Sequence, residues 1–142
     1  MIVSGVLYTG NESELLDRLM DGQFTNVTSD EMVGELEGVL ERPKSGLERD
    51  SIDPVVGMVQ LLSEHVGHSR IHQTMGEIKP LLPKKLDPGD HKVLACSAAG
   101  GCQYITTGDR GLLDLGSFLG CRIVRPLEMI RIIDRDRAGQ PR

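Results

Sequence analysis

The chain has 142 residues, of which 39% are hydrophobic, and its formal net charge is −5. This length supports a single domain, and because the chain has no Trp and few other aromatic residues, its core must be aliphatic. No apolar run approaches the roughly 18 residues of a membrane span, and the acidic balance argues against a nonspecific nucleic-acid coat protein, which is usually basic.

The N-terminal segment and the cysteines indicate where the protein works. MIVSGVLYTGNE has neither a basic leader nor a clear cleavage site, so we do not expect a signal peptide. Cys96, Cys102 and Cys121 are an odd number without framework spacing, and each lies in an apolar setting, which favours buried, reduced thiols. Both features predict a cytoplasmic protein.

Strand and helix patterns alternate in the first half of the chain. Residues 2–8 form an apolar run typical of a buried strand, and residues 24–28 form a second one. Between them, leucines at helical spacing predict a helix over residues 12–20. Ser29 is suited to cap the next helix, which Pro43 ends.

The second half continues in the same manner. We expect a third helix over residues 53–66, whereas the pattern of residues 66–82 is ambiguous and compatible with a strand. Asp90 begins a helix that Gly100 and Gly101 end. The remaining elements are a strand at 102–107, a short helix after Asp109, a strand at 122–124 and a C-terminal helix from Pro126.

This alternation predicts the fold class. Strands that alternate with helices form an α/β domain, in which a parallel sheet is covered by helices on both faces. No linker, repeat or low-complexity tract divides the chain. We therefore predict one domain over residues 1–134 and a disordered tail, RDRAGQPR, over residues 135–142.

Three carboxylates that are distant in sequence are expected at one edge of this sheet. Asp109 follows a strand, Asp90 begins the helix that leads into that strand, and Glu35 lies near the start of another helix. Ligands of open parallel sheets bind at the carboxyl ends of the strands. Because crowded like charges repel, a divalent cation such as Mg²⁺, which prefers carboxylate oxygens, would stabilise this cluster.

Helix capping is the alternative role for these acids. Asp is a preferred N-cap residue, and both Asp90 and Asp109 occupy cap-like positions, so their spacing alone favours capping over metal binding. Glu35 alone is typical of a solvated helix residue. Asp87 and Asp114 are weaker candidates and fit a turn and a short helix.

Three histidines form a second, weaker pattern. His65, His68 and His72 read H-x2-H-x3-H, which on one helix would present three Zn²⁺ ligands on one face. The Gly and Ser between them weaken a helix there, so surface histidines beside a loop are the favoured interpretation.

Four segments together resemble a known family. The most specific one pairs a DP-x-D-x-K helix start with TGD-x-x-LL, within residues 86–116, and neither half is specific alone. The strand and helix of residues 2–24, the acidic helix that ends in Arg-Pro-Lys, and the closing CRIVRPLEMI add to it. Together they resemble PIN-domain ribonucleases, and among these the VapC-like toxin components of toxin–antitoxin pairs, over most of the chain.

The resemblance implies a fold, a reaction and a site. It implies a three-layer α/β/α fold and the cleavage of single-stranded RNA by acidic residues that hold Mg²⁺ or Mn²⁺. By position, Glu35, Asp90 and Asp109 match three acids of the family, and they are expected to be both catalytic and metal-binding. Asp114 is expected nearby in a supporting role.

Basic residues near the expected cleft are candidates for contacts with RNA. An enzyme that holds phosphodiesters through metal ions need not be basic overall, and Arg42, Lys44 and Lys92 are placed to touch phosphates. Solvated helix ends are the alternative interpretation of these three residues. The resemblance further implies a homodimer and an antitoxin-like protein partner.

One departure from the family bears on activity. The first acid of the family belongs to an Asp-Thr-Asn motif that this sequence lacks, and neither Ser4 nor Thr9 replaces its carboxylate. We therefore expect weak metal binding and poor cleavage, whether the native protein starts upstream of Met1 or the chain is a degenerate copy. The rival hypothesis is a non-catalytic PIN-like module that binds itself or an antitoxin-like partner, and a third is a generic α/β protein whose acids are only caps.

Overall fold

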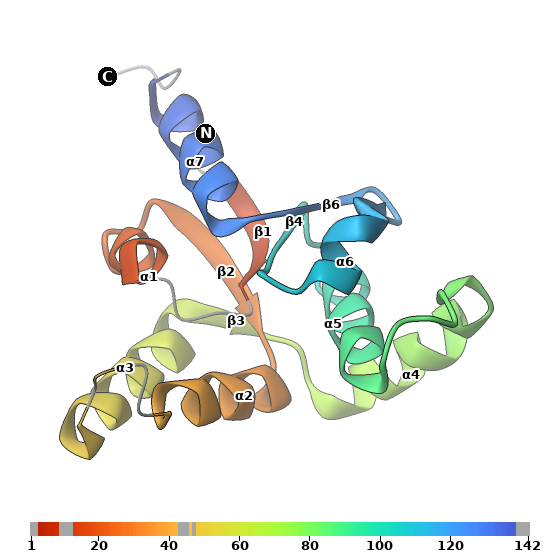
Figure 1. The fold of residues 1–142 in the computed structure, drawn as a ribbon, viewed down its shortest axis with the longest axis horizontal. Coiled ribbons are helices and arrows are strands. Elements are labelled where there is room, and N and C mark those ends of the chain that lie inside the picture. Colours follow the sequence, from red (N-terminus) through yellow and green to blue (C-terminus); the bar gives the residue numbers. More distant parts are fainter. Residues whose placement is uncertain (1–2, 9–12, 43–45, 47, 139–142) are drawn as a thin grey trace.

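A six-stranded sheet forms the centre of the computed structural model, which describes residues 3–8, 13–42, 46 and 48–138 (Figure 1). The strand order is β3-β2-β1-β4-β6-β5, and neighbouring strands pair in parallel except for β5 and β6. The strands are β1 (Val3–Tyr8), β2 (Phe24–Thr28), β3 (Ser63–His65), β4 (Tyr104–Thr106), β5 (Ser117–Phe118) and β6 (Cys121–Val124).

Helices connect these strands. None of the helices in the described residues is long and apolar enough to span a membrane. The helices are α1 (Ser13–Met20), α2 (Asp30–Leu40), α3 (Arg49–Leu62), α4 (His68–Ile78), the 3₁₀ turn η2 (Lys79–Leu81), α5 (Pro88–Ala99), α6 (Arg110–Leu115) and α7 (Pro126–Ala138).

Two hydrophobic clusters lie on opposite faces of the sheet. Neighbouring residues of β1 face different clusters, because side chains alternate along a strand. Leu7 packs with side chains of α4, α5 and α6, whereas Val6 packs with side chains of α1, α2, α3 and α7. Both residues are 0% exposed. The expected three-layer α/β/α fold is therefore confirmed.

Helix α5 is held firmly against the sheet, which fixes the position of its first turn. Its hydrophobic face includes small residues, and Leu94, Ala95 and Cys96 are each at most 1% exposed. Small side chains let a helix approach its neighbours closely. Gly100 is the C-cap, and Gly101 has a φ of 63°, so the glycine pair ends the helix as expected.

Strand β3 replaces the end of a predicted helix. The sequence predicts a helix over residues 53–66, but α3 ends at Leu62 and the next three residues pair with β2. The Asn26 side-chain amide donates a hydrogen bond to Ser63 Oγ at 2.9 Å, which ties the two strands together. Pairing with β2 thus overrides a locally helical pattern, as tertiary contacts often do.

Other differences concern short or ambiguous segments. Most of residues 66–82, whose pattern is compatible with a strand, forms α4 and η2. The two-residue strand β5, which pairs with β6 in an antiparallel hairpin, has no signal in the sequence. Helix α7 continues through Ala138 and so includes residues 135–138, beyond the predicted domain boundary at residue 134.

Candidate active site

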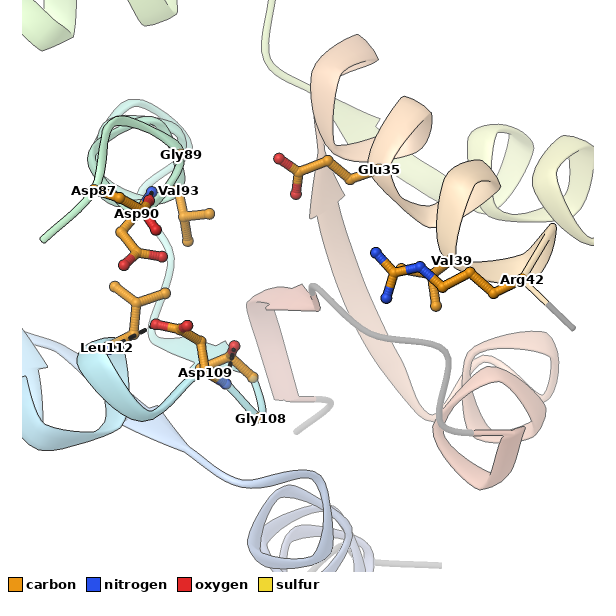
Figure 2. Close-up of a pocket in the computed structure, with 11 residues that line it drawn as sticks. Glu35, Val39, Arg42, Asp87, Gly89, Asp90, Val93, Gly108, Asp109 and Leu112 are labelled. Atoms are coloured by element: carbon orange, nitrogen blue, oxygen red, sulfur yellow. Dashed lines mark hydrogen bonds between the residues drawn. The ribbon is translucent and has the colours of Figure 1, made fainter. Parts of the chain in front are cut away.

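A cleft of about 590 Å³ lies at the carboxyl edge of the sheet (Figure 2). The neighbouring strands β1 and β4 are followed by α1 and α6, which pack on opposite faces of the sheet. Such a switch point is where open α/β sheets bind ligands. The walls come from α2, the start of α5 and the β4–α6 connection: Glu35, Val39, Arg42, Asp87, Gly89, Asp90, Val93, Thr107, Gly108, Asp109 and Leu112.

Asp109 is both a helix cap and a wall of the cleft. Its Oδ2 accepts a hydrogen bond from the Leu112 amide at 3.0 Å, so it caps α6 as predicted. The Asp109 amide donates to Thr107 Oγ1, also at 3.0 Å, and Thr107 is only 3% exposed. The two bonds hold Asp109 in place, and the capping bond uses only Oδ2 of its carboxylate. Asp109 can therefore cap α6 and also bind a ligand.

Asp90 is not the cap of α5. The N-cap is Asp87, whose Oδ1 accepts a hydrogen bond from the Asp90 amide at 2.8 Å, and Pro88 follows it in the first turn. The predicted cap role of Asp90 is therefore wrong, because the helix begins three residues earlier than expected. The Asp90 side chain is instead directed toward Asp109 (Figure 2).

The two aspartates interact electrostatically. The pKa of Asp90 is raised to about 6; partial burial is the largest cause, and the nearby carboxylates of Asp109 and Asp87 contribute to the same rise. A hydrogen bond between the Asp90 and Asp109 side chains also favours the protonated form of Asp90. Ionising both groups places like charges side by side, and either a proton or a bound cation relieves that repulsion.

Glu35 lies on the opposite wall of the same cleft. It projects from α2 into the space that faces Asp90 and Asp109 (Figure 2). Partial burial raises the pKa of Glu35, and the negative charge of Glu31 adds to the rise, whereas Lys92 lowers it. The sequence prediction that these three carboxylates share one edge of the sheet thus agrees with the position of the cleft.

The donor set fits a hard divalent cation at the aspartate pair. Carboxylate oxygens are the ligands that Mg²⁺ prefers, and Mg²⁺ commonly takes one or two carboxylates and completes its shell with water. Across the residues that the structure describes, no group of three or more His, Cys, Asp or Glu side chains is arranged to hold a metal ion. The structure thus brings Asp90 and Asp109 together and leaves Glu35 across the cleft from them.

The three predicted RNA contacts have different surroundings. Arg42 lines the cleft, and its guanidinium points into it (Figure 2). Lys92 does not line the cleft and pairs with Glu31, with 2.7 Å between Lys92 Nζ and Glu31 Oε1. Lys44 lies outside the described residues, as do Thr9 and the side chain of Ser4.

The histidine pattern does not form a site. His65 belongs to β3, whereas His68 and His72 belong to α4, so the three residues do not share one helix. All three are exposed, and a ring nitrogen of His65 lies 3.2 Å from the Gln60 carbonyl oxygen. This arrangement agrees with the interpretation as surface histidines.

The cysteines are not nucleophiles. Cys96, Cys102 and Cys121 are buried and form no disulfide. Burial raises the pKa of the Cys96 and Cys121 thiols to about 11 and that of Cys102 to about 12. Because the thiolate is the reactive form, these protonated groups act as small hydrophobic residues.

Sequence reasoning assigned Asp87 to a turn and did not identify Gly111, and both residues shape the site. Asp87 caps α5, and its negative charge raises the pKa of Asp90. Its signal was the Asp-Pro pair, since Pro is common at the first helical position directly after the cap. Gly111 lies against both aspartates: a Cβ there would be 3.3 Å from Asp109 Oδ2 and 3.6 Å from Asp90 Oδ2. No local pattern reveals that proximity.

Comparison with known proteins gives one match. A family model described as PIN domain matches residues 1–111. The matched region contains Glu35, Asp90 and Asp109 and ends before Asp114. No curated protein matches the chain.

Proposed function

The chain belongs to the PIN-domain family, whose members are in general metal-dependent nucleases, and from this premise we propose that it hydrolyses single-stranded RNA at the cleft with Mg²⁺ or Mn²⁺. The observation that carries this proposal is the pairing of Asp90 and Asp109 at the carboxyl edge of the sheet. We propose further that it is a toxin-type PIN ribonuclease of the cytoplasm that forms a homodimer and is bound by an antitoxin-like protein.

Asp90 and Asp109 are proposed to hold the cation. A divalent cation, when bound, polarises the phosphodiester and lowers the pKa of a water molecule. Asp109 is oriented for this role by its bond from the Leu112 amide, and Asp90 is oriented by its place in the first turn of α5. Glu35, on the opposite wall, is placed to accept a proton or a hydrogen bond from water at its carboxylate.

Arg42 is proposed to orient the substrate. Its guanidinium points into the cleft (Figure 2), and such a planar group donates two parallel hydrogen bonds to a phosphate. Hydrolysis adds the hydroxyl group of water to phosphorus and breaks the bond to the leaving oxygen, which takes up a proton. No side chain of the chain needs to form a covalent intermediate.

A second function is favoured by one observation. Within the described ranges, no three acidic side chains are arranged to hold a metal ion. A PIN-like module that binds itself or an antitoxin-like partner without cleaving RNA would need no such arrangement. An assay of RNA cleavage distinguishes the two functions, because only the ribonuclease would cleave RNA.

Cleavage of a 5′-labelled single-stranded RNA with Mn²⁺ tests the proposal. We expect cleavage by the wild-type chain, its loss on addition of EDTA, and a loss of more than roughly 100-fold in the Asp90→Asn and Asp109→Asn variants, because each removes a metal ligand. Asp21→Asn, in the turn after α1 and away from the cleft, is the matched control and should cleave like the wild type. Equal residual cleavage in all four proteins would indicate a contaminating nuclease, and no cleavage at all would favour the binding module.

A further inference from the structure

A second pocket adjoins the aspartate pair. It has a volume of about 210 Å³ and lies between the η2–α5 connection and α6. Gly111 lies between the two sites, because it lines this pocket and is also close to the carboxylates of Asp90 and Asp109. The pocket is lined by Pro83, Lys85, Leu86, Gly111, Asp114 and Leu115.

Gly111 allows Leu86 and the Asp109 carboxylate to lie close to the backbone of α6. A Cβ built there would lie 3.2 Å from Leu86 Cδ2 and 3.3 Å from Asp109 Oδ2, closer than most real Cβ contacts. Gly111 lies in the first turn of α6, where a side chain would crowd both the Asp109 carboxylate and Leu86.

The walls of the pocket are apolar, with two unpaired charges. Pro83, Leu86 and Leu115 supply apolar surface. Lys85 and Asp114 are exposed, and neither side chain forms a hydrogen bond or an ion pair with any described residue. A ligand that suits these walls has an apolar body, with hydrogen-bond donors for Asp114 and an acceptor for Lys85 along its edge.

The volume limits the size of that ligand. Pockets for drug-sized molecules measure roughly 300–1,000 Å³, so a pocket of about 210 Å³ suits one ring system rather than a whole nucleotide. An unpaired nucleobase has this size and this edge chemistry, and single-stranded RNA presents its bases in this splayed form.

We propose that this pocket binds the base next to the scissile phosphate and that Asp114 selects guanine. The inference rests on the proposed ribonuclease function. A carboxylate accepts two hydrogen bonds from the N1–H and N2–H groups of guanine, and the Lys85 ammonium donates to its O6. Adenine and uracil present no such pair of adjacent donors beside an acceptor, and cytosine presents one amino group.

Titration with free nucleotides tests the pocket without cleavage. The leucine methyl signals of the ¹³C-labelled chain are followed by NMR while 5′-GMP, AMP, CMP or UMP is added without metal. We expect GMP to shift the Leu86 and Leu115 methyl signals at the lowest concentration, and Asp114→Asn to weaken GMP binding by roughly tenfold, the value of one bidentate base contact. Asp21→Asn should bind GMP like the wild type.

Two results would overturn the proposal: no shift of these methyl signals at millimolar GMP, or equal affinity for all four nucleotides in the wild type. Unchanged signals of the other leucines in Asp114→Asn show that the variant is folded. Lys85→Gln, which also replaces an exposed side chain, repeats the test from the opposite wall of the pocket.

Cleavage of a randomised RNA pool then separates the two proposals. If the wild type cuts beside guanine and Asp114→Asn cuts without that preference, both the function and the base pocket are supported. If the chain does not cut at all, the proposed function fails, while the GMP titration still decides whether the pocket selects guanine. Cutting without base preference in the wild type would overturn the base pocket alone.

Discussion

Asp90 shows how one side chain acquires its properties from its neighbours. Asp87 rather than Asp90 is the N-cap of α5, and the Asp87 backbone amide donates a hydrogen bond to the Asp90 carboxyl group, which lowers the pKa of Asp90 in part. The Asp90 carboxyl group is partly buried beside Asp109, and these surroundings raise its pKa to about 6. A carboxyl group that resists ionisation in the folded state destabilises that state when it is forced to ionise.

Replacing Asp90 by Asn should stabilise the metal-free chain at neutral pH. The folded pKa of about 6 exceeds the ordinary value of 3.8. Between these values the folded state binds more protons than the unfolded state, so the contribution of Asp90 to stability falls as pH rises through this window. We expect Asp90→Asn to gain about 1 kcal/mol at pH 7, after discounting for solvent screening, and nothing below pH 4.

Urea unfolding at several pH values, with EDTA present, measures this difference. Asp21→Asn, an exposed acid away from the cleft, should follow the wild type at every pH. A variant whose stability runs parallel to that of the wild type from pH 4 to pH 7 would show that Asp90 ionises normally.

At the scale of single elements, the turn of the β5–β6 hairpin places a leucine, Leu119, in a left-handed backbone conformation that favours glycine. Phe118 pairs with Cys121, so Leu119 and Gly120 form a two-residue turn. Their φ values are 49° and 80°, as a type I′ turn requires. Glycine adopts this region readily, but for a leucine it costs roughly 1–2 kcal/mol.

Leu119→Asn should therefore stabilise the protein. Asn-Gly is the preferred pair for this turn, and Leu119 is 60% exposed, so little packing is lost. We expect a gain of roughly 0.5–1 kcal/mol in the free energy of unfolding. Leu127→Asn, at a site with 59% exposure in α7, is the control for removing an exposed leucine. Equal effects of both substitutions would show that the turn is not strained.

Strand β1 depends on a glycine for a different reason. Its pairing with β2 shifts register between Val3 and Val6, and Gly5, within this shift, has a φ of 65°. A Cβ at Gly5 would lie 3.0 Å from the Cys102 backbone and 3.1 Å from the Gln103 amide nitrogen. The Gln103 amide donates to the Gly5 carbonyl at 2.8 Å, so the two backbones cannot separate without losing this bond.

Gly5→Ala should destabilise the protein markedly. Both the left-handed backbone and the close contact oppose a methyl group, and we expect a loss of roughly 2–3 kcal/mol. Thermal unfolding by circular dichroism measures the loss. Gly22→Ala is the matched control, because Gly22 has a φ of 70° but no atom within 4 Å of its would-be Cβ, so it should lose less. Equal losses would assign the whole effect to the backbone conformation.

At the scale of the whole molecule, the cleft joins parts of the chain that are distant in sequence. Glu35 follows β2, whereas Asp90 and Asp109 flank β4. These strands are separated by β1 in the sheet, so the packing of both helical layers decides how far apart the acids lie. A cation that binds the aspartate pair should therefore stabilise the fold as a whole.

Mn²⁺ should raise the melting temperature of the wild type and not that of Asp109→Asn. A ligand that binds only the folded state adds stability, and free Mn²⁺ at about ten times its Kd would raise the melting temperature by roughly 3–6 °C. Asn is also a good N-cap, so the variant keeps its bond from the Leu112 amide while losing the charge. An equal rise in both proteins would place the cation elsewhere.

The sequence by itself determined the α/β class, most of the elements and the edge at which the acids lie. These features depend on apolar periodicity and on residues that end or begin helices, such as Gly100 and Asp109, and both signals are local. Only the tertiary structure decided that Asp87 rather than Asp90 caps α5, and that residues 63–65 leave the predicted helix to form a strand. It also placed Glu35 across the cleft from the aspartate pair and Gly111 against it. Such distances depend on how whole layers pack, and no short pattern along the chain encodes them.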